Sequence, residues 1–515
     1  MKKTLVSIIV VSVLFFACTK IKTPSEVLPG VTQTVTATVT ATATVTTTPM
    51  VSGTPVDLPD PSFTDTNSDG IDGDASMSIF VDVISGDDAA DGSLDNPKKT
   101  IQAAIDAAVL SGKPSVLVSI GTYNESIMLA AGVSVYGGYA AHNSWARGTA
   151  NECIISGGVT AVTGDNADDV TLALLSVNSA NNTVQGGASV AVFLKNCDNI
   201  IIESCSFTSR NGGNGANGMN GMEGTAGTIG GSGNPGCEND DGICGACSRP
   251  AGGTAGVCSW GRNGGAGGYP GLGGSTGASG VSAVSPGSGG AGGAGGLTAN
   301  NGQPGQPGNA GANGTNGASG LSAGVFTLSG YTASGGESGA DGDHGYGGGG
   351  GGGAGGGVSG FCDWYGTSGG GGGSGGQAGS AGTAGTGGGA SVALMLFDCT
   401  GVVINNTQLA TGNGGIGGNG GTGGSGGNGG AGGSAGAYSA SQGTAGRGGA
   451  GGNGGKGGNG GSGGGGGGGP VINIVYSTTA PVLSGVTYVL GTAGNGGAGG
   501  NVGQNGLSQN TYLIP

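Results

Sequence analysis

Residues 188–213, ASVAVFLKNCDNIIIESCSFTSRNGG, decide the fold, because this stretch occurs more than once in the chain. It returns at residues 390–415 as ASVALMLFDCTGVVINNTQLATGNGG, identical at 10 of 26 aligned positions. A more divergent copy, GPVINIVYSTTAPVLSGVTYVLGTAGNGG, begins at Gly469. Each copy has an apolar run, a polar turn, a second apolar run, another polar turn and an ending at or near Asn-Gly-Gly. Such a repeat indicates stacked structural units.

Short apolar runs separated by polar turns also fill residues 152–211. Strands this short fit a stack of parallel coils, whereas a β-sandwich would have longer strands joined by hairpin turns. We therefore expect N-terminal coils over residues 79–211, a further coil at 390–411, and a last coil with a tail at 470–515.

An amphipathic helix is predicted near the start of these coils. The segment KTIQAAIDAA at residues 99–108 places Ile101, Ala104, Ile105 and Ala108 on one helical face. A stack of coils needs a cap of this kind, because its terminal coil otherwise exposes apolar surface and unpaired strand edges. The spacing therefore predicts a helix that covers the N-terminal end of the coils.

The order of elements around this helix resembles a known family. An apolar strand at residues 79–84 precedes the helix, and a strand at 116–120, the turn GTYNESI at 121–127 and the run GVSVYGGY at 132–139 follow it. This order looks like the N-terminal entry of the pectin-lyase-like proteins. The resemblance implies an all-β fold, a right-handed parallel β-helix with an N-terminal capping helix. Together with its glycine content, the chain resembles glycine-rich lipoproteins of bacterial envelopes that have this fold.

Glycine accounts for 134 of the 515 residues and is concentrated at residues 212–389 and 412–469. Residues 302–320 read GQPGQPGNAGANGTNGASG and residues 414–433 read GGIGGNGGTGGSGGNGGAGG, each with a period of three. This is the period of the polyproline-II helix, although proline is too scarce for collagen. Because glycine lacks a Cβ atom, such segments can approach closely and hydrogen-bond to one another. We expect two ordered, polyproline-II-like arms; disorder is the alternative.

The N-terminus has the features of a targeting segment. Lys2 and Lys3 precede an apolar run at residues 5–16 that is too short to span a bilayer, and Cys18 follows. Residues 1–18 resemble a bacterial lipoprotein signal peptide, which implies lipidation of Cys18, a membrane partner and a place at the outer membrane surface. An ordinary secretory signal is the alternative. Residues 19–78 predict a Thr- and Pro-rich tether that ends in an acidic loop.

The acidic loop, DTNSDGIDGD at residues 65–74, is a candidate calcium site. Asp65, Asn67 and Asp69 alternate along the chain as in a calcium-binding loop, and Asp72 and Asp74 add further carboxylates. The twelfth position is Ser76 where an EF-hand has a bidentate Glu, so the loop is not an EF-hand. It resembles the Asp/Asn/Gly repeats of extracellular bacterial proteins, which implies calcium as a cofactor. The alternative is an acidic spacer.

Six cysteines are candidates for disulfide bonds. Four of them cluster in the first glycine tract: Cys237, Cys244, Cys247 and Cys258. Zinc is one interpretation, but no His lies nearby and exported chains favour disulfides, so we expect two disulfides with the pairing open. The other two, Cys197 and Cys399, occupy the same position of the repeat. Direct stacking of the repeats would make them neighbours, either as a disulfide or as a ladder of buried thiols.

The sequence lacks the pattern of a polysaccharide-degrading enzyme. Such β-helix enzymes need paired carboxylates, whereas Asp198, Glu203 and Asp398 occur singly in the coils. His142 and His344 are isolated. A formal net charge of −15 argues against nucleic acid as a partner.

These features predict a non-catalytic, lipid-anchored bacterial surface protein with a structural or adhesive role. Its expected partners are the membrane, through the lipid, and polysaccharide or other envelope components. Two alternatives remain open. One is a carbohydrate-binding or polysaccharide-degrading β-helix protein, and the other is an ice- or surface-binding glycine bundle.

Overall fold

The computed structural model describes residues 57–239, 242–283 and 300–515. The chain divides into residues 1–53 and residues 54–515, and all of the described fold belongs to the second unit. The predicted signal peptide with Cys18, and most of the predicted tether, lie outside the described residues. Within the described part, each helix is too short or too polar to cross a membrane.

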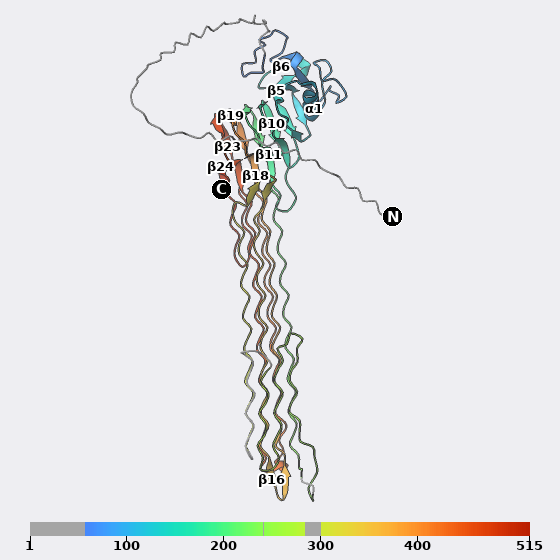
Figure 1. Cartoon of the computed structure of the whole chain (residues 1–515), viewed down its shortest axis with the longest axis vertical. Coiled ribbons are helices and arrows are strands. Elements are labelled where there is room, and N and C mark those ends of the chain that lie inside the picture. The colour runs from blue at the N-terminus through green and yellow to red at the C-terminus, as the bar shows by residue number, and fades with distance from the viewer. Residues whose placement is uncertain (1–56, 240–241, 284–299) are drawn as a thin grey trace, which may run out of the picture. The chain divides into compact units, whose positions relative to one another are not determined.

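Three parallel sheets contain most of the strands (Figure 1). The first sheet contains β1 (Ser78–Val81), β2 (Ser115–Ser119), β5 (Ser134–Ala140), β9 (Val170–Ala173), β12 (Ile200–Glu203), β19 (Val403–Asn405) and β22 (Val482–Ser484), with β6 (Ala146–Arg147) antiparallel to β5. The second contains β3 (Gly121–Tyr123), β7 (Cys153–Ser156), β10 (Leu175–Asn178), β13 (Ser206–Thr208), β20 (Gln408–Ala410) and β23 (Thr487–Val489). The third contains β4 (Ile127–Met128), β8 (Thr160–Asp165), β11 (Ser189–Lys195), β18 (Ser391–Phe397), β21 (Val471–Tyr476) and β24 (Ser508–Leu513).

From β2 onward the chain visits these sheets in rotation, first, second and third, so each coil adds one strand to each sheet. The glycine tracts always interrupt the rotation at the same place, between a strand of the second sheet and the next strand of the third. The predicted β-rich fold with parallel sheets is confirmed.

The sequence repeats stack directly on one another. In the third sheet Val190 of β11 is in register with Val392 of β18, which is in register with Ile472 of β21. The corners between strands also repeat, and they use residues with positive φ. Asn196 has a φ of 54° and its counterpart Asp398 a φ of 49°. Asn and Asp tolerate this left-handed conformation better than other non-glycine residues, which explains their place at the corners.

The core lies between the three sheets and is closed at the N-terminal end by α1 (Ile101–Ser111). The helix buries the residues predicted for its apolar face, namely Ile101, Ala104, Ile105 and Ala108. Thr100 caps its first turn and Gly112, with a φ of 66°, ends it. The carboxylate of Glu125 accepts hydrogen bonds from the backbone N–H groups of Ile101 and Gln102, which the first helical turn leaves without intrahelical partners.

The glycine tracts form one bundle of extended segments, which Figure 1 shows running side by side. The two long tracts therefore pack against each other in a single bundle. Gly215, Gly218 and Gly221 donate backbone hydrogen bonds from the first tract to carbonyls of the second, at Ile416, Asn419 and Thr422. Bonds recur at every third residue along these segments.

Two hairpins interrupt the first tract. One, β14 (Val325–Thr327) and β15 (Gly330–Thr332), covers the outer face of the third sheet, where Phe326 packs in a cluster with Val392 and Ile472. The other, β16 (Gly357–Ser359) and β17 (Cys362–Trp364), joins two glycine segments. The remaining helical turns are short: Ala75–Met77, Ala141–Asn143 and Ala440–Gln442.

Candidate functional site

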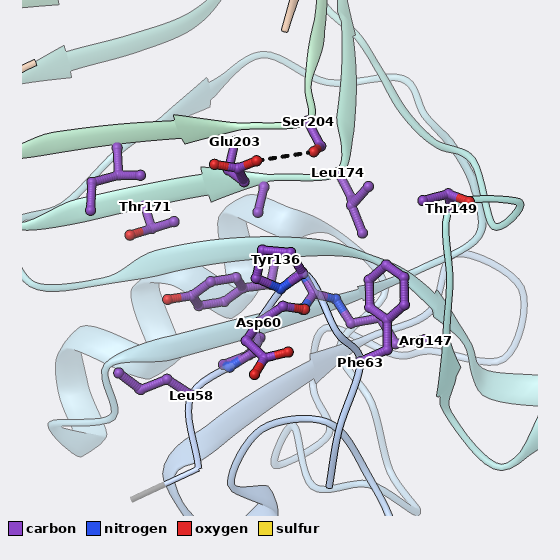
Figure 2. Close-up of a pocket in the computed structure, with 14 residues that line it drawn as sticks. Leu58, Asp60, Phe63, Tyr136, Arg147, Thr149, Thr171, Leu174, Glu203 and Ser204 are labelled. Atoms are coloured by element: carbon purple, nitrogen blue, oxygen red, sulfur yellow. Dashed lines mark hydrogen bonds between the residues drawn. The ribbon is translucent and has the colours of Figure 1, made fainter. Parts of the chain in front are cut away.

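A groove of about 340 Å³ lies on the outer face of the first sheet (Figure 2). Residues 58–63 form one wall, and β5, β9 and β12 contribute Tyr136, Thr171 and Ile201. These side chains point outward because the neighbouring positions, such as Val135 and Leu172, point into the core and strand residues alternate between faces. The groove is mainly apolar, with a few polar groups at its edge.

Arg147, from β6, holds this wall together. Its Nη1 lies 2.8 Å from Oδ2 of Asp72, and both side chains are 2% exposed. Its Nε donates to the carbonyl of Gly137 at 3.0 Å. The guanidinium also lies over the rings of Tyr139 and Tyr136, 5.2 and 5.6 Å from their centroids. Because these contacts use the guanidinium of Arg147, its role is to stabilise the fold and not to bind an anionic ligand.

Two carboxylates line the groove, Glu203 and Asp60. Glu203 Oε1 accepts from Ser204 Oγ at 3.2 Å and from Asn406 Nδ2 at 3.0 Å. The hydrogen bond from the Ser62 hydroxyl lowers the pKa of Asp60. A groove with an apolar floor and hydrogen-bond acceptors at its edge is suited to binding. Sequence reasoning did not single out Tyr136 or Arg147, because residues distant in the chain form this wall.

The acidic loop keeps three of its predicted calcium ligands together. Asp65 Oδ2 accepts from Gly70 N at 2.9 Å, and Asn67 Oδ1 accepts from Asp69 N at 2.9 Å. Asp69 Oδ2 accepts from Ala75 N at 2.8 Å. These bonds to the backbone set the shape of the loop.

The other two predicted ligands, Asp72 and Asp74, have different partners. Asp72 is buried against Arg147, and burial raises its pKa although the guanidinium lowers it. Asp74 caps the turn at Ala75–Met77 by accepting from the N–H groups of Ser76 and Met77. Among the described residues, the one group of three potential ligands within 4.8 Å of one another is Glu238, Cys244 and Cys362, whose sulfurs are in a disulfide. Calcium binding at residues 65–74 stays a prediction.

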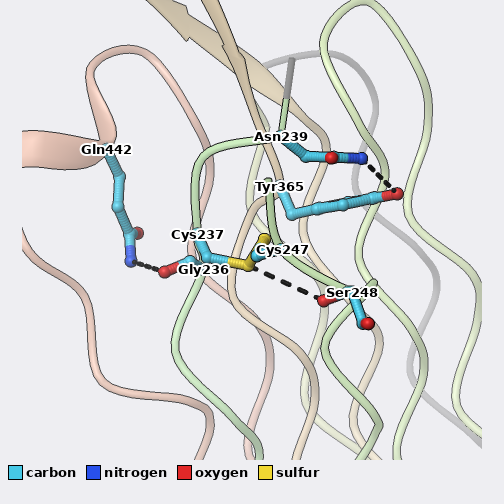
Figure 3. The surroundings of a disulfide bond; sticks show 7 residues. All are labelled: Gly236, Cys237, Asn239, Cys247, Ser248, Tyr365 and Gln442. Carbon is cyan, nitrogen blue, oxygen red and sulfur yellow. Dashed lines mark hydrogen bonds between the residues drawn. A yellow bond between two sulfur atoms is a disulfide. The ribbon is translucent and has the colours of Figure 1, made fainter. Parts of the chain in front are cut away.

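The structure contains two disulfides, Cys237–Cys247 and Cys244–Cys362 (Figure 3 shows the first). Cys258, expected among the bonded cysteines, is a free thiol, and Cys362 is bonded instead. The backbone explains this difference: Asn239 N donates to Asp363 O, and Tyr365 N donates to Cys237 O. These hydrogen bonds hold β17 beside residues 237–239. The residues around Cys237 and Cys362 show no sequence pattern that predicts this contact.

Cys197 and Cys399 are neighbouring buried thiols, each 2% exposed. Of the two arrangements predicted for this pair, the structure has buried thiols side by side and not a disulfide. The neighbouring Cys399 thiol lowers the pKa of Cys197 to about 7, and the proximity of Cys197 raises the pKa of Cys399, because the two groups titrate as a pair. Burial raises the pKa of Cys153 to about 11 and of Cys205 to about 12. All four thiols pack in or beside the core.

Comparison of the chain with protein-family models, with curated proteins and with solved structures finds no match. The resemblance of residues 79–139 to pectin-lyase-like proteins therefore rests on the sequence pattern alone.

Proposed function

We propose that this chain is a non-catalytic, lipid-anchored bacterial surface protein with a structural or adhesive role. The glycine bundle is the observation that carries this proposal. Its segments hydrogen-bond to one another at every third residue. Two runs of consecutive glycine, residues 347–353 and 369–373, are buried at its centre. A bundle bonded in this way is stiff, and a stiff extension suits a spacer or a display surface better than it suits catalysis.

The proposal includes a finer description of the fold. We take the three sheets as the faces of a right-handed parallel β-helix, with α1 as its N-terminal cap. The rotation of the chain through three parallel sheets supports this description. We take the glycine segments as polyproline-II helices, supported by the three-residue period of their hydrogen bonds.

Location is proposed from the sequence of residues 1–18. Lys2 and Lys3, the apolar run and Cys18 support a lipoprotein signal, and thus attachment to the outer membrane through lipid on Cys18. A second candidate function is carbohydrate binding. The groove beside Tyr136 favours it, because an apolar floor with hydrogen-bonding groups at the edge suits a sugar.

The test uses the full chain expressed in a Gram-negative bacterium and labelled with a palmitate analogue. We expect wild type to incorporate the label and to be cleaved by protease added to intact cells. The Cys18→Ala variant should incorporate none, whereas Cys258→Ala, which removes another thiol, should be labelled as wild type. Equal labelling of wild type and Cys18→Ala, or full protection of wild type on intact cells, would refute the anchored surface location.

A further inference from the structure

Two grooves lie where the coils meet the glycine bundle, and they share Asn211. One, of about 540 Å³, includes Asn181, Asn211 and Thr411. The other, of about 380 Å³, includes Asn211, Asn214 and Asn413. Together they make a polar surface that runs from the ends of the second-sheet strands onto the bundle.

Asparagines on this surface form a ladder that crosses successive coils. Asn181 Oδ1 accepts from Asn211 N at 3.0 Å, Asn211 Oδ1 accepts from Asn413 N at 2.8 Å, and Asn413 Oδ1 accepts from Thr492 N at 2.9 Å. Each of these residues follows a strand of the second sheet, so direct stacking of the coils produces the ladder.

The same arrangement continues along the bundle. The side-chain oxygens of Asn214, Asn217 and Asn220 accept from the backbone N–H groups three residues apart on the neighbouring segment, at 2.8 to 2.9 Å. Asn419 Oδ1 accepts in turn from Ala498 N at 2.8 Å. The result is a two-dimensional array, since three residues of a polyproline-II segment advance the chain by about 9 Å.

These bonds leave one side of every amide available. The seven asparagines of the array, Asn181, Asn211, Asn214, Asn217, Asn220, Asn413 and Asn419, are exposed. A backbone N–H requires an acceptor, so each oxygen faces the protein and each Nδ2 faces outward. Throughout residues 57–239, 242–283 and 300–515, no group accepts a hydrogen bond from any of these seven nitrogens. The surface is a regular array of fixed donors.

We propose that this asparagine array is a binding site for an extended neutral polysaccharide, an inference that rests on the adhesive function proposed above. Repeating hydroxyl and ring oxygens of such a chain offer acceptors at regular intervals to donors that are already oriented, which limits the entropy lost on binding. The ligand is neutral because Arg210 is the single charged residue among those that line the two grooves, which is too little charge to hold a polyanion or a polycation.

Substitution by Asp separates the binding role from the structural one. An Asp side chain keeps the oxygen that accepts from the backbone but has no amide donor. Asn313 provides a matched control, because its Oδ1 makes the same bond, to Asn459 N at 2.8 Å, on a part of the bundle outside both grooves.

The experiment measures binding of the full chain, extracted in detergent, to microcrystalline cellulose, to chitin and to dextran. We expect wild type to bind at least one of them. The triple variant Asn211→Asp, Asn214→Asp, Asn413→Asp should bind at least tenfold more weakly, and Asn313→Asp should bind as wild type. A urea midpoint equal to that of wild type shows that a variant is folded; if the triple variant is unfolded, Asn413→Asp alone serves the same comparison.

Equal binding by the folded Asp variant and wild type would overturn the proposal, and so would wild type that binds none of the three polysaccharides. Inhibition of ice recrystallisation without polysaccharide binding would overturn it in favour of an ordered-water ligand. Failure here is distinguishable from failure of the proposed function, because palmitate labelling and protease access at the cell surface do not depend on these asparagines.

Discussion

Arg147 and Asp72 form a buried ion pair between segments that lie far apart in the sequence. Both are buried, and their ion pair fastens the segment before β1 to the outer face of the first sheet. Arg147 also donates to the carbonyl of Asp60, so the wall of the groove depends on it. A buried pair adds little net stability compared with apolar residues, but loss of one partner leaves an uncompensated charge.

We predict that Arg147→Met lowers the free energy of unfolding by about 3 kcal/mol at pH 7, because Asp72 then stays buried without its cation. Burial already raises the pKa of Asp72, and removal of Arg147 raises it further. A raised carboxyl pKa means that the folded state binds the proton more tightly than the unfolded state. The deficit should therefore be largest above that pKa and shrink as the pH falls towards it.

Urea denaturation of wild type and variant at pH 7 and pH 5 measures this difference. The double variant Arg147→Met, Asp72→Asn removes both charges and should recover part of the lost stability at pH 7. A deficit of the same size at both pH values would contradict the electrostatic explanation.

At the scale of the element, the glycine segments owe their packing to the absence of side chains. Three consecutive residues, 369–371, donate to and accept from six different segments, through Gly268, Gly253, Gly449, Gly351, Gly231 and Gly433. With a neighbour on every side, no position of the period is free for a side chain. Runs of consecutive glycine therefore mark the centre of the bundle, and Gly-X-Y triplets mark its surface, as at residues 302–320.

We predict that Gly350→Ala destabilises the bundle by about 3 kcal/mol, because the new Cβ would lie 2.0 Å from the carbonyl oxygen of Ala266. Gly335→Ala is the matched control on the same segment, since its Cβ would meet nothing closer than 3.4 Å. Thermal unfolding followed by circular dichroism compares the two. Similar melting temperatures for both variants would show that the centre of the bundle is loosely packed.

At the scale of the whole molecule, long-range connections join parts of the chain that the sequence separates. The Cys244–Cys362 disulfide closes a loop of 118 residues, whereas Cys237–Cys247 closes one of 10. Backbone hydrogen bonds also join the two tracts, such as the one from Gly215 N to Ile416 O. The sequence separation of these two residues is close to the separation between the repeat copies that begin at residues 188 and 390. The larger loop restricts the unfolded chain more.

We predict that Cys244→Ser, Cys362→Ser lowers the free energy of unfolding by about 5 kcal/mol and Cys237→Ser, Cys247→Ser by about 3 kcal/mol, from the loop-closure entropy of each bond. Chemical denaturation of the two double variants under oxidising conditions gives the comparison. Equal losses would mean that the loops contribute through local contacts and not through the entropy of the unfolded chain.

Much of the coil architecture could be predicted from particular residues. Ile101, Ala104, Ile105 and Ala108 have helical spacing and are the buried face of α1. The candidate sites were harder to predict from the sequence, because they depend on contacts between segments that are distant in the chain. Cys362 lies far along the chain from Cys244, and the outward amides of the asparagine array appear only when the coils are stacked.

The parallel, β-rich coils follow from the amino-acid pattern, because apolar residues alternating with polar ones specify which face of each strand is buried, and repeated copies specify which coils stack on one another. Contacts in three dimensions were needed to establish which glycine segments are neighbours, that both long tracts share one bundle, and which cysteines pair. The glycine segments contact one another through backbone N–H and C=O groups, which are the same in every glycine, so the residue pattern does not indicate which segment pairs with which. The cysteine pairs in turn depend on which of these segments lie side by side.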